Sequence, residues 1–277
     1  MILILFRMSL LTIAFSFFQS YSKAQRVSAN PYALSLGSCS YALDDLSSIG
    51  NNPAAYPNLK GIVLQSHYRN KFFSSALNDY AAHALYNAPK YGSLGLHFQR
   101  SGFRLFNRNE LSASYSRFFG PAFSIGMNFN YHFIQQASHY PTLHTFSADL
   151  GLQVRFLERF VWGFVIYNPI PMRLSSLWPE KIPTIIGTGF QYRNPNGIRI
   201  CMEIDKWIQG KWGFKLGASY QLLKAYSVSL GFKTNPLAPS LGFGFTHKQW
   251  HLHWGAAYNN PLGLEMALSL AYQWKRE

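Results

Sequence analysis

Apolar and polar residues alternate along most of the chain after residue 60. In residues 212–222 the even positions are apolar or aromatic, and the odd positions are glycine, polar or charged. Residues 226–233 and 263–274 repeat the pattern. A period of two residues is typical of a β-strand with one apolar and one polar face. The sequence therefore predicts an all-β protein.

Fourteen segments carry this alternation, and most are close to the ~9–11 residues that cross a bilayer as a tilted strand. They are residues 61–68, 79–88, 92–99, 109–118, 122–135, 145–156, 159–167, 184–193, 197–204, 211–222, 226–233, 240–246, 250–258 and 263–274. The gaps between them are mostly long after odd-numbered segments and short after even-numbered ones. Outer-membrane barrels have an even strand number, short turns on one side and long loops on the other. We therefore predict a transmembrane antiparallel β-barrel of about 14 strands over residues 61–277.

Charged residues fall on the polar face of the better-defined strands. A Lys or Arg on the lipid face of a barrel costs ~2–4 kcal/mol at the bilayer midplane. We expect the following side chains to line the lumen: Asp149, Arg155, Arg199, Glu203, His251, His253 and Glu265. Aromatic residues fall on the opposite face, several near strand ends, as in the girdles of such barrels: Trp162, Trp250, Trp254, Tyr258, Tyr272 and Trp274.

Composition and the first residues agree with a membrane location. Charged residues make up 13% of the chain, whereas soluble domains carry about 25%. Residues 1–24 contain Arg7, an apolar run and small residues just before Gln25. This arrangement predicts a signal peptide over residues 1–24. We expect the mature chain in the outer membrane of a Gram-negative cell.

Residues 25–60 precede the first strand and lack its alternation. Fourteen strands enclose a lumen wider than that of the eight-strand barrels that side chains alone can fill. Glycine inside a strand often marks the close approach of another backbone, and glycine is frequent at the expected lumen positions: Gly95, Gly126, Gly151, Gly163, Gly187, Gly189, Gly213, Gly217, Gly231, Gly242, Gly244 and Gly255. We predict that residues 25–60 form a plug inside the lumen.

Two short motifs carry a resemblance to a known family. The predicted plug combines a small-residue step, an acidic pair and an Asn-Pro-Ala turn: Gly37, Asp44, Asp45, Asn52, Pro53 and Ala54. Together they resemble the N-terminal plug of the FadL superfamily of outer-membrane barrels. Residues 167–168 and 182–192 resemble its PorV/PorQ branch, which is associated with type IX secretion.

The resemblance implies two alternative functions. In the first, the barrel is a component of the type IX protein secretion system and binds secreted cargo or other secretion subunits through its extracellular loops. In the second, it is a FadL-like channel for hydrophobic small molecules. The sequence favours the first because loop 168–183 would expose apolar residues, which usually mark contacts: Ile170, Met172, Leu174, Leu177 and Trp178.

The remaining candidate chemistry points away from an enzyme. Asp44 and Asp45 could bind a ligand or metal, but an acidic pair without spaced His or Cys is a poor metal site, which favours a structural role. His251 and His253 form a His-x-His pair to which no third ligand can be assigned. No diagnostic Ser–His pairing or phosphate-binding glycine loop is visible. We expect no catalytic residues, no metal and no cofactor.

The chain carries a formal net charge of +14. In an exported barrel this basic excess does not indicate binding of nucleic acid, and we expect other acidic partners at the surface. Several basic residues fall in the predicted long loops: Arg69, Lys71, Arg100, Arg104, Arg108, Arg173 and Lys181. They could pair with lipopolysaccharide phosphates or with an acidic protein, or remain simply solvated. Membrane lipid, lipopolysaccharide and proteins of the secretion machinery are the expected partners.

The two cysteines lie in different predicted parts of the molecule. Cys39 belongs to the plug, and the alternation puts Cys201 on the lumen face. An exported protein passes through a compartment where disulfides form. A bridge needs Cα atoms within ~7 Å of each other. The sequence leaves open whether the two are bridged or are separate buried thiols.

Overall fold

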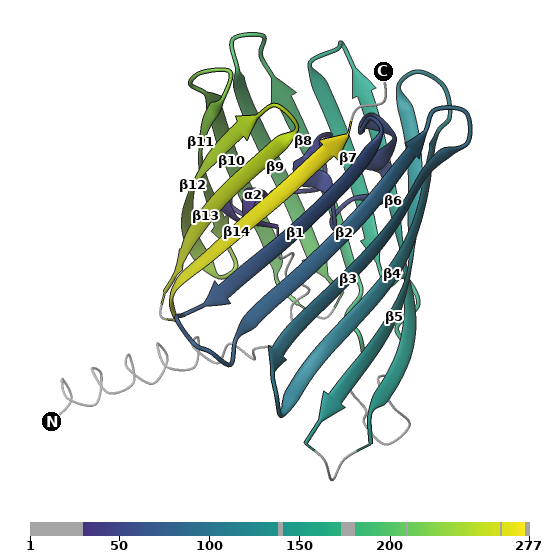
Figure 1. Cartoon of the computed structure of the whole chain (residues 1–277), viewed down its shortest axis with the longest axis vertical. Helices are drawn as coiled ribbons and strands as arrows, with labels where there is room; N and C mark the ends of the chain where they lie inside the picture. Colours follow the sequence, from purple (N-terminus) through teal and green to yellow (C-terminus); the bar gives the residue numbers. More distant parts are fainter. Residues whose placement is uncertain (1–29, 138–140, 173–180, 209, 261, 275–277) are drawn as a thin grey trace, which may run out of the picture.

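The structure is a computed structural model that describes residues 30–137, 141–172, 181–208, 210–260 and 262–274. Fourteen antiparallel strands close into one barrel, in which each strand pairs with its neighbours in sequence and β1 pairs with β14 (Figure 1). The predicted all-β barrel is confirmed. The signal peptide predicted over residues 1–24 lies outside the described residues.

The strand bounds follow the alternation closely. The strands are β1 (Ile62–Lys71), β2 (Asn78–Ala88), β3 (Gly92–Phe103), β4 (Phe106–Phe118), β5 (Phe123–Gln136), β6 (Leu143–Phe156), β7 (Phe160–Tyr167), β8 (Ile185–Arg193), β9 (Ile198–Trp207), β10 (Trp212–Gln221), β11 (Tyr226–Thr234), β12 (Leu237–His247), β13 (Trp250–Asn259) and β14 (Gly263–Trp274). Three short helical segments precede them: α2 (Pro31–Ser35), η1 (Leu46–Ser48) and η2 (Pro53–Asn58). Among the described residues, no helix is long and apolar enough to cross a membrane.

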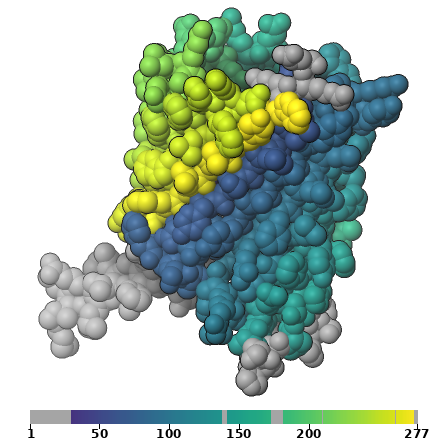
Figure 2. Space-filling view, viewed as in Figure 1, coloured from purple at the N-terminus to yellow at the C-terminus, as the bar shows by residue number. Residues whose placement is uncertain are grey.

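The two faces of the wall differ as the alternation predicts. On β11, Leu230 is 65% exposed on the outer face, whereas its neighbour Ser229 is 4% exposed. Antiparallel pairing brings residues of the same face together, so Leu230 lies opposite Leu241, and Ser229 lies opposite Gly242. The outer wall is therefore an apolar surface of adjacent tilted strands, with β14, β1, β2 and β3 side by side (Figure 2).

The two ends of the barrel carry different connections. We call the end where β1 begins and β14 ends the turn end, at the top in Figure 1, and the opposite end the loop end. At the loop end some strands run further than predicted. β3 and β4 leave only residues 104–105 between them, and β11 and β12 leave only residues 235–236. The predicted loops at 100–108 and 234–239 were wrong, because strand hydrogen bonds continue where the apolar alternation fades.

This extension moves several basic residues out of the predicted loops. Arg69 and Lys71 lie in β1 and are paired inside the lumen, Arg69 with Glu265 and Lys71 with Asp79. Their assignment to outer loops was wrong. Arg100 and Arg108 also lie in strands. Arg104 and Lys181 lie between strands, and Arg173 lies outside the described residues.

Residues 30–59, called the plug below, lie inside the ring of strands (Figure 1). Helix α2 contacts β11 to β14, and η2 contacts β4 to β6 on the other side of the lumen. The wall glycines that a plug atom approaches most closely are Gly126, Gly151, Gly163, Gly187, Gly217, Gly231, Gly242 and Gly255. A Cβ on Gly231 would lie 2.0 Å from the backbone nitrogen of Gly37. The small lumen positions therefore accommodate plug backbone.

We expect the substitution Gly231→Ala to displace the plug while the barrel still assembles. The new methyl group would meet plug backbone, which cannot rotate away, and such overpacking costs ~1–3 kcal/mol. Gly244→Ala is the control, since its Cβ would lie 2.4 Å from the Ser227 hydroxyl, a side chain that can rotate. Protease cleavage of the plug in assembled barrels measures the effect. Equal resistance in the two variants would contradict this account of the glycines.

Candidate functional site: the lumen and its plug

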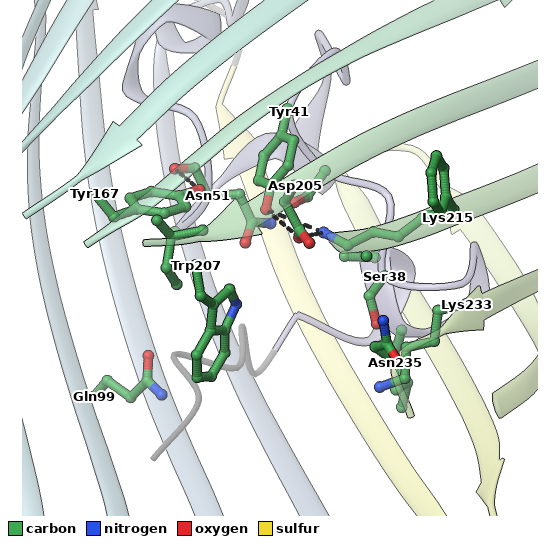
Figure 3. A pocket seen from close by; sticks show the side chains of 17 residues that line it. Ser38, Tyr41, Asn51, Gln99, Tyr167, Asp205, Trp207, Lys215, Lys233 and Asn235 are labelled. Carbon is green, nitrogen blue, oxygen red and sulfur yellow. Dashed lines mark hydrogen bonds and ion pairs between the residues drawn. The ribbon is translucent and has the colours of Figure 1, made fainter. Parts of the chain in front are cut away.

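A charged network on β9 and β10 holds the middle of the plug. The carboxylate of Glu203 accepts hydrogen bonds from the backbone nitrogens of Ser40 at 2.6 Å and Tyr41 at 2.5 Å. The Tyr41 hydroxyl donates to Asp205 at 2.9 Å, and Lys215 lies 2.7 Å from the same Asp205 carboxylate oxygen. Burial, and then the Asp205 carboxylate, raise the pKa of Tyr41 well above its ordinary value, so the hydroxyl remains a donor. Figure 3 shows Tyr41, Asp205 and Lys215 converging.

Asp44 is held at the turn end of the lumen. One of its carboxylate oxygens accepts from Gln191 at 3.0 Å and from Arg193 at 2.6 Å. The other lies 3.4 Å from Arg155. Asp44 and Arg155, both predicted site residues, are therefore brought together, whereas Arg193 and Gln191 are additional partners. All of these partners lie on the wall, so the contacts tie the plug to β6 and β8.

Asp45 has its own partner on the wall. It forms an ion pair and a hydrogen bond with Arg199, and it also accepts from the backbone nitrogen of Ser47 at 3.1 Å as the cap of η1. Burial opposes ionisation, but the guanidinium groups of Arg199 and Arg193 outweigh it and hold the pKa of Asp45 below its ordinary range. The acidic pair thus forms a latch, which we define as Asp44 and Asp45 with Arg155, Arg193 and Arg199.

The Asn-Pro-Ala turn is fixed through Asn52. Its amide nitrogen donates to the backbone oxygens of Tyr41 at 2.6 Å and Leu152 at 3.3 Å, and its amide oxygen accepts from Ala54 at 3.0 Å. A Cβ on Gly151 would lie 2.1 Å from that amide oxygen. Asn52, Pro53 and Ala54 therefore form a structural corner of the plug that contacts the wall.

The other predicted lumen residues lie inside the barrel but are dispersed. Asp149 accepts from Asn130 at 2.8 Å, and His253 lies 3.1 Å from the Ser35 hydroxyl. His251 contacts Thr246 at 3.2 Å, and Glu265 pairs with Arg69. The structure does not gather these residues into one site. Among the residues that it describes, no group of three or more His, Cys, Asp or Glu could hold a metal ion.

Cys39 and Cys201 meet in one buried cluster with Leu36 and Leu43. Both thiols are free, and the Cys39 sulfur lies 3.8 Å from the backbone oxygen of Cys201. Burial, together with the neighbouring Cys201, raises the pKa of Cys39 well above its ordinary value. Of the two alternatives left open by the sequence, the structure shows separate buried thiols.

Loop 168–183 is tied at both ends. The Asn168 side chain donates to Ile182 at 2.7 Å, and the Thr184 hydroxyl donates to the Asn168 backbone oxygen at 2.6 Å. Ile170 is 72% exposed and Met172 is 38% exposed. The predicted contact residues Leu174, Leu177 and Trp178 lie outside the described residues.

A cavity of about 70 Å³ lies on the loop-end side of the plug. One wall is apolar and aromatic, formed by Tyr167, Ile185 and Trp207 (Figure 3). The other side carries Ser38, Lys215, Lys233 and Asn235. The sequence pattern did not predict this cavity. Lys233 had a visible signal because it stands on the polar face of residues 226–233, but Trp207 fell in a predicted loop.

Comparisons with known proteins identify the fold. No family model matches the chain, and no curated protein matches it. Among solved structures it is similar to the monoaromatic hydrocarbon channel CymD, with TM-score 0.71 and 11% identity over 89% of this chain and 98% of that one. A Pseudomonas aeruginosa FadL homologue gives TM-score 0.64 and 10% identity over 88% and 98%. The Pseudomonas putida toluene transporter TodX gives 0.63 and 7% over 90% and 97%. The chain therefore has a FadL-like fold.

We expect Asp45→Asn to loosen the turn end of the plug at pH 7 by at most about 1 kcal/mol, because the Asp45 side chain is 38% exposed. A carboxylate whose pKa is lowered by folding stabilises above its unfolded pKa of about 3.9 and loses this effect as pH falls through the folded value. Wild type and variant should therefore differ from pH 7 to about pH 4 and converge in stronger acid.

Hydrogen exchange of residues 44–48, followed by mass spectrometry, measures this difference. Asp79→Asn is the matched control, because it removes an ion pair with Lys71 that lies away from the latch. It should leave exchange in the latch unchanged. A difference between wild type and Asp45→Asn that persists in strong acid would rule out the ion pair as its cause.

Proposed function

We propose that this protein is an outer-membrane channel for small hydrophobic molecules that is closed by its plug. The observation that carries the proposal is the cavity on the loop-end side of the plug, where the apolar side chains of Tyr167, Ile185 and Trp207 suit an apolar solute. The shared fold supports it, since CymD and TodX are channels for such molecules. Of the two functions implied by the sequence, we therefore favour the FadL-like channel over the component of type IX secretion.

Passage requires the plug to move. Plug backbone contacts the wall from Gly126 to Gly255, and the cavity of about 70 Å³ stops at plug residues such as Ala33 and Leu34. A molecule that enters from the loop end is therefore blocked by the plug. The latch lies on the turn-end side of the plug. A plug that moves would break its ion pairs.

Toluene uptake tests the channel directly. Cells that lack their own hydrophobic channel should take up toluene several-fold faster when they express this barrel. Trp207→Ala should lower the rate because it removes part of the aromatic wall. Trp250→Ala is the control, since Trp250 is 50% exposed on the outer face. A rate equal to that of cells without the protein would contradict the proposal.

The outer face fits the same membrane setting. Apolar side chains cover it, and Arg100 and Arg104 are exposed near the loop end. In an outer membrane the loop end would face outward, where these two guanidinium groups would pair with lipopolysaccharide phosphates. This orientation follows from the usual placement of long loops in outer-membrane barrels.

A second candidate function is the binding of partner proteins of the type IX secretion system. The observation in its favour is the exposure of Ile170 and Met172 in loop 168–183. If the loop binds a partner, Ile170→Ser should weaken co-purification of that partner from native membranes. Ile208→Ser is the control, because Ile208 is 58% exposed outside that loop. Unchanged co-purification in Ile170→Ser would remove the support for this function.

A further inference from the structure

Lys233 is a largely buried lysine that faces the cavity on the loop-end side of the plug. The residue is 7% exposed, and among the described residues its side chain has neither a hydrogen bond nor an ion pair. A largely buried lysine without a counter-charge is uncommon, and the Lys233 nitrogen keeps accessible surface at the cavity (Figure 3). The ammonium group is therefore accessible to a molecule that enters this cavity.

The carboxylates that act on Lys233 are engaged elsewhere. Asp205 lies 2.7 Å from Lys215 and accepts from Tyr41, and Glu265 pairs with Arg69. Neither is within ion-pair distance of Lys233. Neither carboxylate therefore serves as the counter-charge of Lys233.

A second unused donor stands beside Lys233. Gly37 packs against the backbone of Phe232, which places Ser38 next to Lys233 at the cavity. The Ser38 hydroxyl has no hydrogen bond among the described residues. Its backbone has φ of 67°, a conformation that few non-glycine residues adopt. An ammonium and a hydroxyl at one side of a cavity form a site for an oxyanion.

The opposite side of the cavity is mostly apolar, with the side-chain amides of Asn51 and Gln99 nearby (Figure 3). Trp207 packs against a buried cluster of Tyr41, Tyr167 and Ile185. The volume of about 70 Å³ is roughly half of the ~150 Å³ that holds benzene in an engineered protein core. The cavity therefore has room for a small charged group and part of a ring. The rest of a bound molecule would extend toward the loop end.

We infer that Lys233 and Ser38 bind the carboxylate of a small organic acid whose compact apolar body lies against Trp207. This inference rests on the proposed channel function for passage of the solute, and it narrows the solute class. The hydrocarbons named for CymD and TodX have no charge that could pair with Lys233. The anionic group is therefore inferred from Lys233 and Ser38 of this chain, and not from the similar structures.

Binding of benzoate and toluene to the purified barrel in detergent tests the inference. The two molecules share a ring and differ in the carboxylate, and isothermal titration measures both. Lys233→Met keeps the length of the side chain and removes its charge. Its benzoate affinity should fall about 10- to 100-fold, as expected for loss of a charged hydrogen bond, while its toluene affinity stays unchanged. Lys233→Arg should retain benzoate binding within a few-fold.

Lys224→Met is the matched control, because Lys224 is exposed in the turn between β10 and β11. Its benzoate affinity should equal that of wild type. Lys233→Met should also resist heat unfolding about as well as wild type, since among the described residues Lys233 has no hydrogen bond or ion pair to lose. Benzoate binding that is equal in wild type and Lys233→Met, or absent in wild type, would overturn the inference. Failure of the channel is seen separately, as toluene uptake no faster than in cells without the protein.

Discussion

The structure depends on backbone-to-backbone contact between the plug and the barrel wall. Such contact requires wall positions without a side chain, and the lumen faces of the strands supply them. Gly231 faces the Gly37 backbone nitrogen, and Gly163 faces the Tyr41 backbone oxygen. Larger residues at these positions would hold the plug away from the wall. The wide lumen of a 14-strand barrel is filled in this way by the chain's own first described residues.

Close contact alone would leave buried backbone groups without partners, and each such group costs ~1–3 kcal/mol. Polar wall residues solve this problem at specific points. Glu203 accepts from two successive plug nitrogens, and Ser124 donates to the backbone oxygen of Ala54. The charged latch adds contacts at the turn end. The plug is thus held by many separate hydrogen bonds and ion pairs that are spread around the wall.

The sequence predicted the wall well because the period of two is imposed directly by the membrane and the lumen. The 14 strands and the lumen side of Glu203 and Arg199 follow from it. The loop-end extensions of β3 and β4 did not, because strand hydrogen bonds beyond the apolar zone do not require alternation. The partners of Asp44 could not be predicted either. Arg155 and Arg193 are more than 100 residues away in sequence, and only the closed barrel brings them to the plug.

The cavity illustrates the same limit. Lys233 was visible as a lumen residue, but its lack of a partner depends on the pairing of Asp205 with Lys215 and of Glu265 with Arg69. Likewise, Trp207 belongs to the aromatic wall only because β9 extends to that residue. Which polar groups remain unpaired can therefore be seen only in the assembled barrel, and the sequence alone does not predict it.

A reversible lock on the plug tests the central claim most directly. Ser35 and Ser229 have their hydroxyl oxygens 2.7 Å apart, one in α2 and one in β11. The substitutions Ser35→Cys and Ser229→Cys, in a chain with Cys39→Ala and Cys201→Ala, would join them by a disulfide. The plug already continues into β1, so both of its ends would then be fixed. Toluene uptake should stop in the oxidised protein and return after reduction. Equal uptake in both states would show that passage does not require movement of the plug.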